Sequence, residues 1–289
     1  MEGLTWERRP ELRDPFLICS FKGSNDAADS ATTALEFLAR KWSAERVAAI
    51  DPDDFFDFQV TRPHVRLTEG QTREIVWPEL VLFSGHVAGS DRDALLLTGP
   101  EPNMRWRALT RIVVELAREA EVGMVVSLGA LLADVPHTRP VQITGIAGDP
   151  ALAERLGSSQ TRYEGPTGIV GVLQDGCRRA GLGCASLWAA VPHYVAAVPS
   201  PKAALGLVRT MERLLEIEVE ADELETASSE YEERLDEAVA NEPEVRSLVE
   251  RLEQQLDEED ISFGDLPSGD SIAREFQRFL RDQGRRGEG

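Results

Sequence analysis

The sequence contains few of the residues that build disulfide frameworks, metal centres or membrane spans. Its three cysteines are an odd number without metal-type spacing, so we expect three small core residues and a reducing compartment, the cytoplasm. The four histidines are scattered, and we expect no metal site. No apolar run approaches the about 18 residues that cross a bilayer, and the first residues lack the apolar region of a secretion signal. We therefore expect a protein with no membrane segment, no metal and no cofactor.

Common catalytic signatures are also missing. There is no G-x-x-x-x-G-K-[ST] phosphate loop and no G-x-S-x-G nucleophile elbow. The glycines between Gly165 and Gly171 lack the G-x-G start of a dinucleotide fingerprint, and we interpret them as permitting a tight turn, with phosphate binding as the alternative. We assign no catalytic residue, and a non-enzymatic role is favoured over an enzyme.

Positive charge is scarce, and the imbalance is local. The chain carries a net charge of −20, and residues 216–260 contain nineteen acidic residues and three arginines. Such a segment repels phosphate backbones and anionic lipid, so we expect neither a nucleic-acid partner nor a membrane partner. A basic protein partner is compatible with it. The alternative is that these carboxylates form the solvated faces of helices.

Strand-like and helix-like segments alternate through residues 10–220, which predicts an α/β domain with a mixed, largely parallel sheet. Strands 73–77 and 80–83, joined by Pro78 and Glu79, are expected to form a hairpin. The other expected strands are 16–21, 47–50, 94–98, 124–128, 141–146 and 184–191, and the expected helices are 26–42, 106–120, 168–180 and 201–217.

Beyond residue 220 the sequence predicts a helical appendage. In residues 221–260 apolar residues recur at helical spacing, and Pro243 restarts the pattern, which indicates a coiled-coil-like pair of acidic helices forming a hairpin. Residues 261–289 are expected to form a loop, an amphipathic helix that starts at Asp270, and a disordered end. We expect this appendage to be peripheral to the α/β core.

Ligands of open α/β sheets bind beyond the carboxyl ends of the strands, so the loops that follow the strands supply the candidate site. The loop after residue 21 offers a lysine and backbone N–H groups to an anion. The residues around Trp106 form either a docking surface or a core layer. The loop between Pro136 and Pro140 either presents a rigidly held base or anion clamp, or its side chains hydrogen-bond to neighbouring carbonyls or to a partner subunit. The candidates for ligand binding or an interface are Lys22, Asn25, Asp26, Glu101, Arg105, Trp106, His137, Thr138, Arg139 and Thr167.

An ordered series of segments over about residues 10–220 resembles the PAC2 (proteasome assembly chaperone 2) family. The match is to the whole series rather than to one short motif. The segments are 21–26, 51–58 with Arg62-Pro63, Trp77-Pro78, 99–102 with Trp106, 128–131, 136–140, 165–171 and 191–194.

The resemblance implies a fold like that of purine nucleoside phosphorylase and peptidyl-tRNA hydrolase, a three-layer α/β domain. It also implies self-assembly, for which a trimer is expected, and, as in eukaryotic and archaeal relatives, a chaperone or activator role at the proteasome core. The helical tail and the Pro-His-Thr-Arg-Pro form resemble the actinobacterial branch. The chain ends Arg286-Gly287-Glu288-Gly289 instead of in the hydrophobic-tyrosine pattern of ring-docking relatives, so insertion of the tail into the proteasome is not expected. The alternative function is binding or turnover of a nucleoside, nucleotide or phosphate at the strand-end loops.

Overall fold

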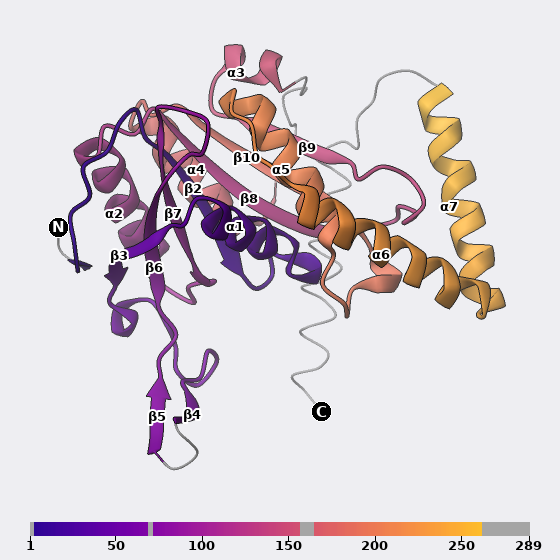
Figure 1. Ribbon diagram of the computed structural model, residues 1–289, viewed down its shortest axis with the longest axis horizontal. Helices are drawn as coiled ribbons and strands as arrows, with labels where there is room; N and C mark the ends of the chain where they lie inside the picture. The colour runs from indigo at the N-terminus through magenta and orange to yellow at the C-terminus, as the bar shows by residue number, and fades with distance from the viewer. Residues whose placement is uncertain (1–2, 69–71, 157–164, 262–289) are drawn as a thin grey trace.

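An eight-stranded mixed sheet forms the centre of the computed structural model, which describes residues 3–68, 72–156 and 165–261 (Figure 1). The strand order across the sheet is β1-β3-β6-β7-β2-β8-β10-β9. Its strands are β1 (Leu4–Trp6), β2 (Phe16–Lys22), β3 (Glu45–Ile50), β6 (Leu80–His86), β7 (Asp93–Pro100), β8 (Met124–Ala133), β9 (Ile143–Ala147) and β10 (Cys184–Pro192).

Parallel pairing is limited to the middle of the sheet. Strands β7, β2, β8 and β10 run parallel to one another, whereas β1, β3 and β6 on one side and β9 on the other join through antiparallel pairs. The expected mixed α/β sheet is confirmed, with a parallel portion that is smaller than the sequence pattern indicates. Because the central parallel strands share one direction, their carboxyl ends meet at one edge.

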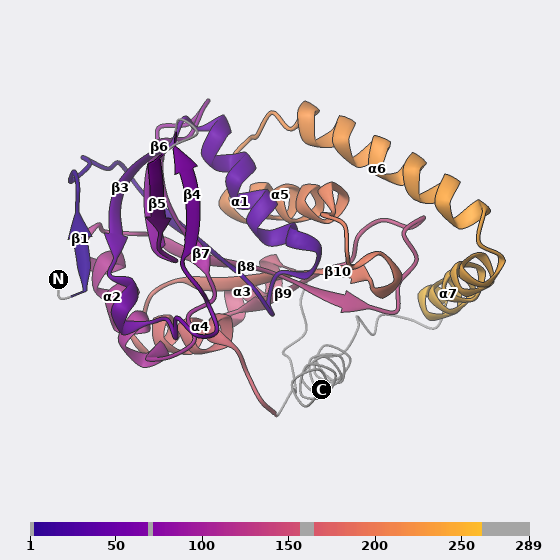
Figure 2. The ribbon, with the colours of Figure 1, turned by 90° about the horizontal axis from the view of Figure 1, so that it is seen from below.

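Helices cover both faces of this sheet, which confirms the three-layer α/β architecture (Figures 1 and 2). Helices α1 and α5 pack together on one face, and α2 and α4 pack together on the other. Within the described chain, no helix combines the length and the apolar character needed to cross a bilayer. The helices are α1 (Ser30–Lys41), α2 (Trp106–Glu119), α3 (Pro150–Arg155), α4 (Ile169–Arg179), α5 (Pro201–Leu215), α6 (Asp222–Ala240) and α7 (Pro243–Ile261).

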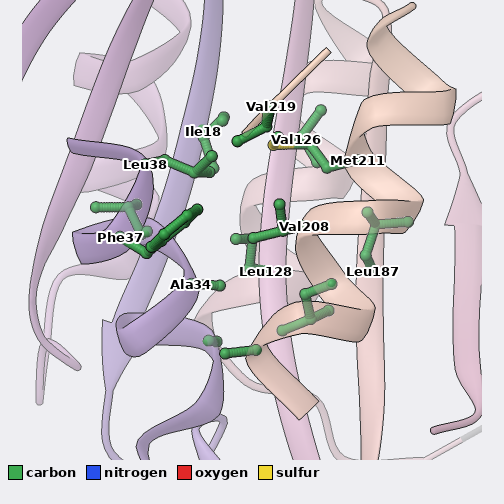
Figure 3. Packing of buried hydrophobic residues seen from close by; sticks show 14 of the residues in the cluster. Ile18, Ala34, Phe37, Leu38, Val126, Leu128, Leu187, Val208, Met211 and Val219 are labelled. Carbon is green, nitrogen blue, oxygen red and sulfur yellow. The ribbon is translucent and has the colours of Figure 1, made fainter. Parts of the chain in front are cut away.

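Strand β2 separates the two hydrophobic cores. Its side chains alternate, so that Phe16 and Ile18 enter the core beneath α1 and α5, while Leu17 and Cys19 enter the core beneath α2 and α4. Both faces of the strand are therefore buried, which explains its continuous apolar run. Figure 3 shows the first core, in which residues of α1 and α5 pack together over one face of the sheet.

The predicted hairpin of residues 73–77 and 80–83 is wrong. Strand β5 (Thr72–Val76) pairs with β4 (His64–Thr68) in a separate two-stranded sheet, whereas β6 pairs with β3 and β7. A two-residue hairpin turn requires a positive φ at its first central position, and the proline ring fixes φ near −65°. Pro78 therefore separates the two strands instead of joining them. The sequence pattern also missed β1, β4 and the short helix α3.

Helix α6 packs along α5, and Leu224 and Tyr231 of α6 are buried. The chain breaks after α6 as Pro243 predicts, but α6 and α7 diverge from their connection instead of lying side by side as a coiled-coil-like hairpin (Figures 1 and 2). The division at residue 220 stays a prediction, because Leu224 belongs to the same hydrophobic cluster as β2 and α1. The expected terminal helix from Asp270 lies outside the described residues.

Candidate functional site

A cavity of about 420 Å³ lies at the carboxyl ends of the central parallel strands. We call it the strand-end pocket. Its walls come from the turn between β2 and α1 (residues 23–29), the end of β8, residues of β9 and β10 within the sheet, α4 and the segment before it (166–174), and the segment 196–199. This is the place where the loops of an open α/β sheet are expected to bind a ligand. Of the sequence candidates, Asn25, Asp26 and Thr167 line the pocket.

The turn after β2 is held by the carboxylate of Glu101. This carboxylate accepts hydrogen bonds from the backbone N–H of Ser24 (3.2 Å), from the Ser24 hydroxyl and from Nδ2 of Asn25 (2.6 Å). Gly23 has a φ of +155°, and a Cβ at that position would lie 3.0 Å from Cβ of Glu101. Only glycine fits such a close approach without strain. Glu101 therefore shapes the pocket wall from behind, with its oxygens already occupied by donors of the turn.

The buried Asp26 carboxylate caps α1. It accepts hydrogen bonds from the backbone N–H groups of Ala31 (2.6 Å) and Thr32 (3.2 Å) and from the Thr32 hydroxyl. Burial raises the pKa of the Asp26 carboxyl, and the hydrogen bonds from Thr32 and Ala31 act in the opposite direction. The expected helix begins at Ser30 and not at Asp26, because Ala28 and Asp29 adopt left-handed φ values of 52° and 49°. Asp26 is thus a structural residue whose carboxylate oxygens are satisfied within the fold.

The start of α4 forms a second wall of the pocket. Gly168 precedes the helix without a side-chain cap, and a Cβ there would lie 2.9 Å from Oδ1 of Asn25, so the glycine permits close packing. The interpretation of these glycines as packing residues agrees with this contact. A network that sequence reasoning missed joins three side chains that line the pocket: Trp188 Nε1 donates to Ser186 Oγ (3.2 Å), and that hydroxyl donates to Oε1 of Gln174 in α4 (3.0 Å).

The remaining strand-end candidates lie outside the pocket lining. Lys22 is exposed and pairs with Asp29 at 3.2 Å. Arg105, which has a φ of 56°, pairs with Asp54, and its guanidinium lies 5.9 Å from the centre of the Phe55 ring. Trp106 begins α2 and donates from Nε1 to the carbonyl of Pro102 at 2.6 Å. These contacts brace the loop after β7 rather than converge on a common ligand.

His137 is buried in the loop that follows β8, away from the strand-end pocket. Its backbone N–H donates to the Tyr194 hydroxyl (2.7 Å), Nδ1 lies 2.7 Å from the same hydroxyl, and Nε2 lies 3.1 Å from Oδ1 of Asp236 in α6. These contacts are satisfied when the Tyr194 O–H donates to Nδ1 and the N–H at Nε2 donates to Asp236. Burial raises the pKa of Tyr194 to about 12, which keeps this hydroxyl protonated.

The neighbours of His137 bind the acidic helices. Thr138 donates to Glu253 of α7, and Arg139 pairs with Asp257 (2.8 Å) of the same helix. Lys202 at the start of α5 donates from Nζ to the carbonyls of His137 (2.5 Å) and Arg139 (2.8 Å) and also pairs with Glu232 of α6. We call these contacts of residues 137–139 and Lys202 with α6 and α7 the acidic latch.

The structure therefore separates the sequence candidates into three groups. Asn25, Asp26 and Thr167 line the pocket. Lys22, Glu101, Arg105 and Trp106 support the neighbouring loops, and His137, Thr138 and Arg139 hold the acidic helices. Among the described residues, no cluster of histidine, cysteine, aspartate or glutamate is placed to hold a metal ion. The carboxylates and the imidazole described above already have partners within the fold, and the hydroxyls of Ser24, Thr32 and Tyr194 are among those partners.

Comparison with known protein families identifies the family of this chain. The sequence model of the PAC2 family matches residues 20–239, which include the strand-end pocket, the loop around His137 and nearly all of α6. The chain belongs to the PAC2 family. The resemblance drawn from the sequence is thereby confirmed, and α6 falls within the family match although it was expected to belong to the appendage.

Solved structures of PAC2 relatives share the fold over most of their length. A proteasome-assembly chaperone homologue of Mycobacterium tuberculosis is 43% identical, with a TM-score of 0.76, and the match covers 81% of this chain and 99% of that one. A PAC2 family protein of Streptomyces avermitilis is 44% identical, with a TM-score of 0.75 and coverage of 82% and 100%. A second Mycobacterium tuberculosis protein, of unknown function, is 26% identical, with a TM-score of 0.84 and coverage of 98% and 97%. Among curated proteins there is no match.

Proposed function

We propose that this PAC2 protein is a non-catalytic, homo-oligomeric assembly chaperone or interaction protein of the cytoplasm, with proteasome subunits as its partners. The observation that carries the proposal is the 43% identity, over 99% of its length, to a protein described as a proteasome-assembly chaperone homologue. A trimer is the proposed oligomeric state.

The bonding of the candidate residues supports a non-catalytic role. Glu101 and Asp26 stabilise the start of α1, and His137 joins the domain to α6. A general base must be within hydrogen-bond reach of the proton that it removes, and these groups are engaged with the fold itself. The proposal therefore assigns recognition to the surface of the α/β domain and to α6 and α7, rather than to a reaction centre.

Purification of the tagged protein from its own host at low salt, followed by mass spectrometry, tests the proposed partner. We expect proteasome α-subunits or their assembly intermediates to be enriched over a tagged control protein of similar acidity. The acidic control is needed because a chain with a net charge of −20 attracts basic proteins without specificity. Equal recovery with the two proteins would remove proteasome subunits from the proposal.

The strand-end pocket favours one second function, the binding of a small molecule. Its volume of about 420 Å³ lies within the range of about 300–1,000 Å³ that is usual for ligand sites. A thermal-shift screen with nucleosides, nucleotides and inorganic phosphate tests this function, because a ligand at about 100 times its dissociation constant stabilises the fold by about 2.7 kcal/mol. Unchanged unfolding temperatures with all of these ligands would exclude the phosphorylase-like alternative for them.

A further inference from the structure

The exposed apolar side chains of the described residues are gathered in two places. The larger group lies on the two-stranded sheet of β4 and β5, which we call the β-arm, and around its base; the other is at the mouth of the strand-end pocket. Figure 1 shows the β-arm projecting away from the eight-stranded sheet. The exposed large hydrophobic residues are Val60, Val65, Leu67, Ile75, Val76, Trp77 and Met104 on the arm or near its base, and Val198 at the pocket.

One face of the β-arm is apolar. In the antiparallel register Val65 lies opposite Ile75, and Leu67 lies opposite Arg73, so these four residues share a face. Val65, Leu67 and Ile75 are 63%, 61% and 56% exposed. An isolated two-stranded ribbon is marginally stable in water, and an exposed apolar patch on a projecting element marks an interaction surface.

The strand-end pocket is complementary to this face in shape and in charge. The arm projects from the domain (Figure 1), whereas the pocket is a cavity of about 420 Å³ lined by apolar residues such as Leu131, Val170 and Val198. Residues 60–77 contain three arginines and two glutamates, a net charge of +1 in a chain whose net charge is −20, and the charged residues that line the pocket are both acidic, Asp26 and Asp29. Arg73 shares the apolar face, and Asp29 lines the pocket.

We propose that the β-arm of one copy of this chain packs into the strand-end pocket of a second copy. Such a contact joins two different surfaces of the same chain, and a head-to-tail contact of this kind closes into a ring when the rotation between copies permits it. The inference rests on the homo-oligomeric part of the proposed function. It also places protein side chains in the pocket that the alternative function reserves for a small molecule.

Two substitutions disable one surface each. Val65→Asp places a carboxylate on the apolar face of the arm, and Val198→Asp places one at the mouth of the pocket. His64→Asp is the matched control, because it adds the same charge at the adjacent exposed position on the opposite face of β4. Circular dichroism and thermal unfolding establish that each variant is folded before its mass is compared.

Size-exclusion chromatography with light scattering then measures the mass of each full-length protein. We expect a closed oligomer for the wild type and for His64→Asp, and a monomer of 31.9 kDa for Val65→Asp and for Val198→Asp. An equimolar mixture of these two variants contains one intact arm surface and one intact pocket, so it should form a dimer of twice that mass and nothing larger.

Three outcomes overturn the proposal. A monomeric wild type shows that the arm has no second copy as its partner. A wild-type mass for Val65→Asp, or for Val198→Asp, shows that the substituted surface is not part of the interface. A mixture that remains monomeric shows that the arm and the pocket do not bind each other. Because no proteasome subunit takes part, any of these results leaves the proposed proteasome partner to its own experiment.

Discussion

The substitution Lys202→Met is the most direct test of the acidic latch. The side chain is only 14% exposed, and its ammonium group donates to the carbonyls of His137 and Arg139 and pairs with Glu232. Methionine keeps most of the apolar stem but removes all three interactions. Two backbone carbonyls and one carboxylate then lose their donor in a partly buried site.

The expected loss is about 2 kcal/mol of unfolding free energy. Hydrogen bonds from charged groups contribute about 1.5–3 kcal/mol each in buried sites, and water that reaches the 38%-exposed Glu232 reduces the total here. At about 2–4 °C per kcal/mol, the unfolding temperature should fall by about 4–8 °C. Urea denaturation and calorimetry measure the two quantities independently.

Lys41→Met is the matched control. Lys41 also pairs with a carboxylate of α6, but its partner Glu223 is 72% exposed and 3.6 Å away. Surface pairs of this kind contribute about 0–1 kcal/mol, so the control should unfold within about 1 kcal/mol of the wild type. Equal effects of the two substitutions would refute the view that Lys202 holds the loop between Pro136 and Pro140 to the acidic helices.

Three further predictions concern packing, titration and the domain boundary. Gly129→Ala should destabilise the fold by about 1–3 kcal/mol in urea, because its Cβ would lie 2.6 Å from the Trp188 ring, while the control Gly123→Ala, whose nearest contact would be 3.8 Å, should be close to neutral. The pKa of Tyr194 is raised to about 12, so the native state keeps a proton that the unfolded state loses near pH 10. The free energy of unfolding should therefore fall as pH rises from 10 to about 12. Tyr194→Phe should remove this part of the pH dependence. Truncation after residue 220 uncovers the surface of α5 that Tyr231 and α6 bury, and we expect a folded domain with a cooperative transition at lower urea concentration; a non-cooperative transition would show that α6 belongs to the domain.

The latch changes the interpretation of the acidic segment. From the sequence, residues 216–260 were either a surface for a basic partner or the solvated faces of helices. In the structure some of these carboxylates, including Asp236 and Asp257, serve as partners for His137 and Arg139 of the same chain. A basic partner that bound α7 at Asp257 would have to compete with Arg139. Part of the acidic segment therefore pairs with charged and polar groups of the same chain.

The sequence by itself determined the elements whose pattern is local. The apolar run of β2 predicted a buried strand, and the apolar stripe of α2 predicted a helix, because the side-chain periods of 2.0 and 3.6 residues can be read from the order of apolar residues. Pro243 likewise predicted the break between α6 and α7. The ordered series of segments also identified the PAC2 family. The same local signals placed Asn25, Asp26 and Thr167 at strand ends, where the pocket is found.

Only the tertiary structure decided which distant residues became partners. Residue 137 lies 99 positions before Asp236, and residue 139 lies 118 positions before Asp257. Among 51 acidic residues, no local pattern distinguishes these carboxylates from their neighbours. Strand pairing is likewise a contact at a distance, and for that reason β5 was assigned to the wrong neighbour. Periodicity reports which side of an element is buried, whereas the choice of partner depends on how the elements pack in three dimensions.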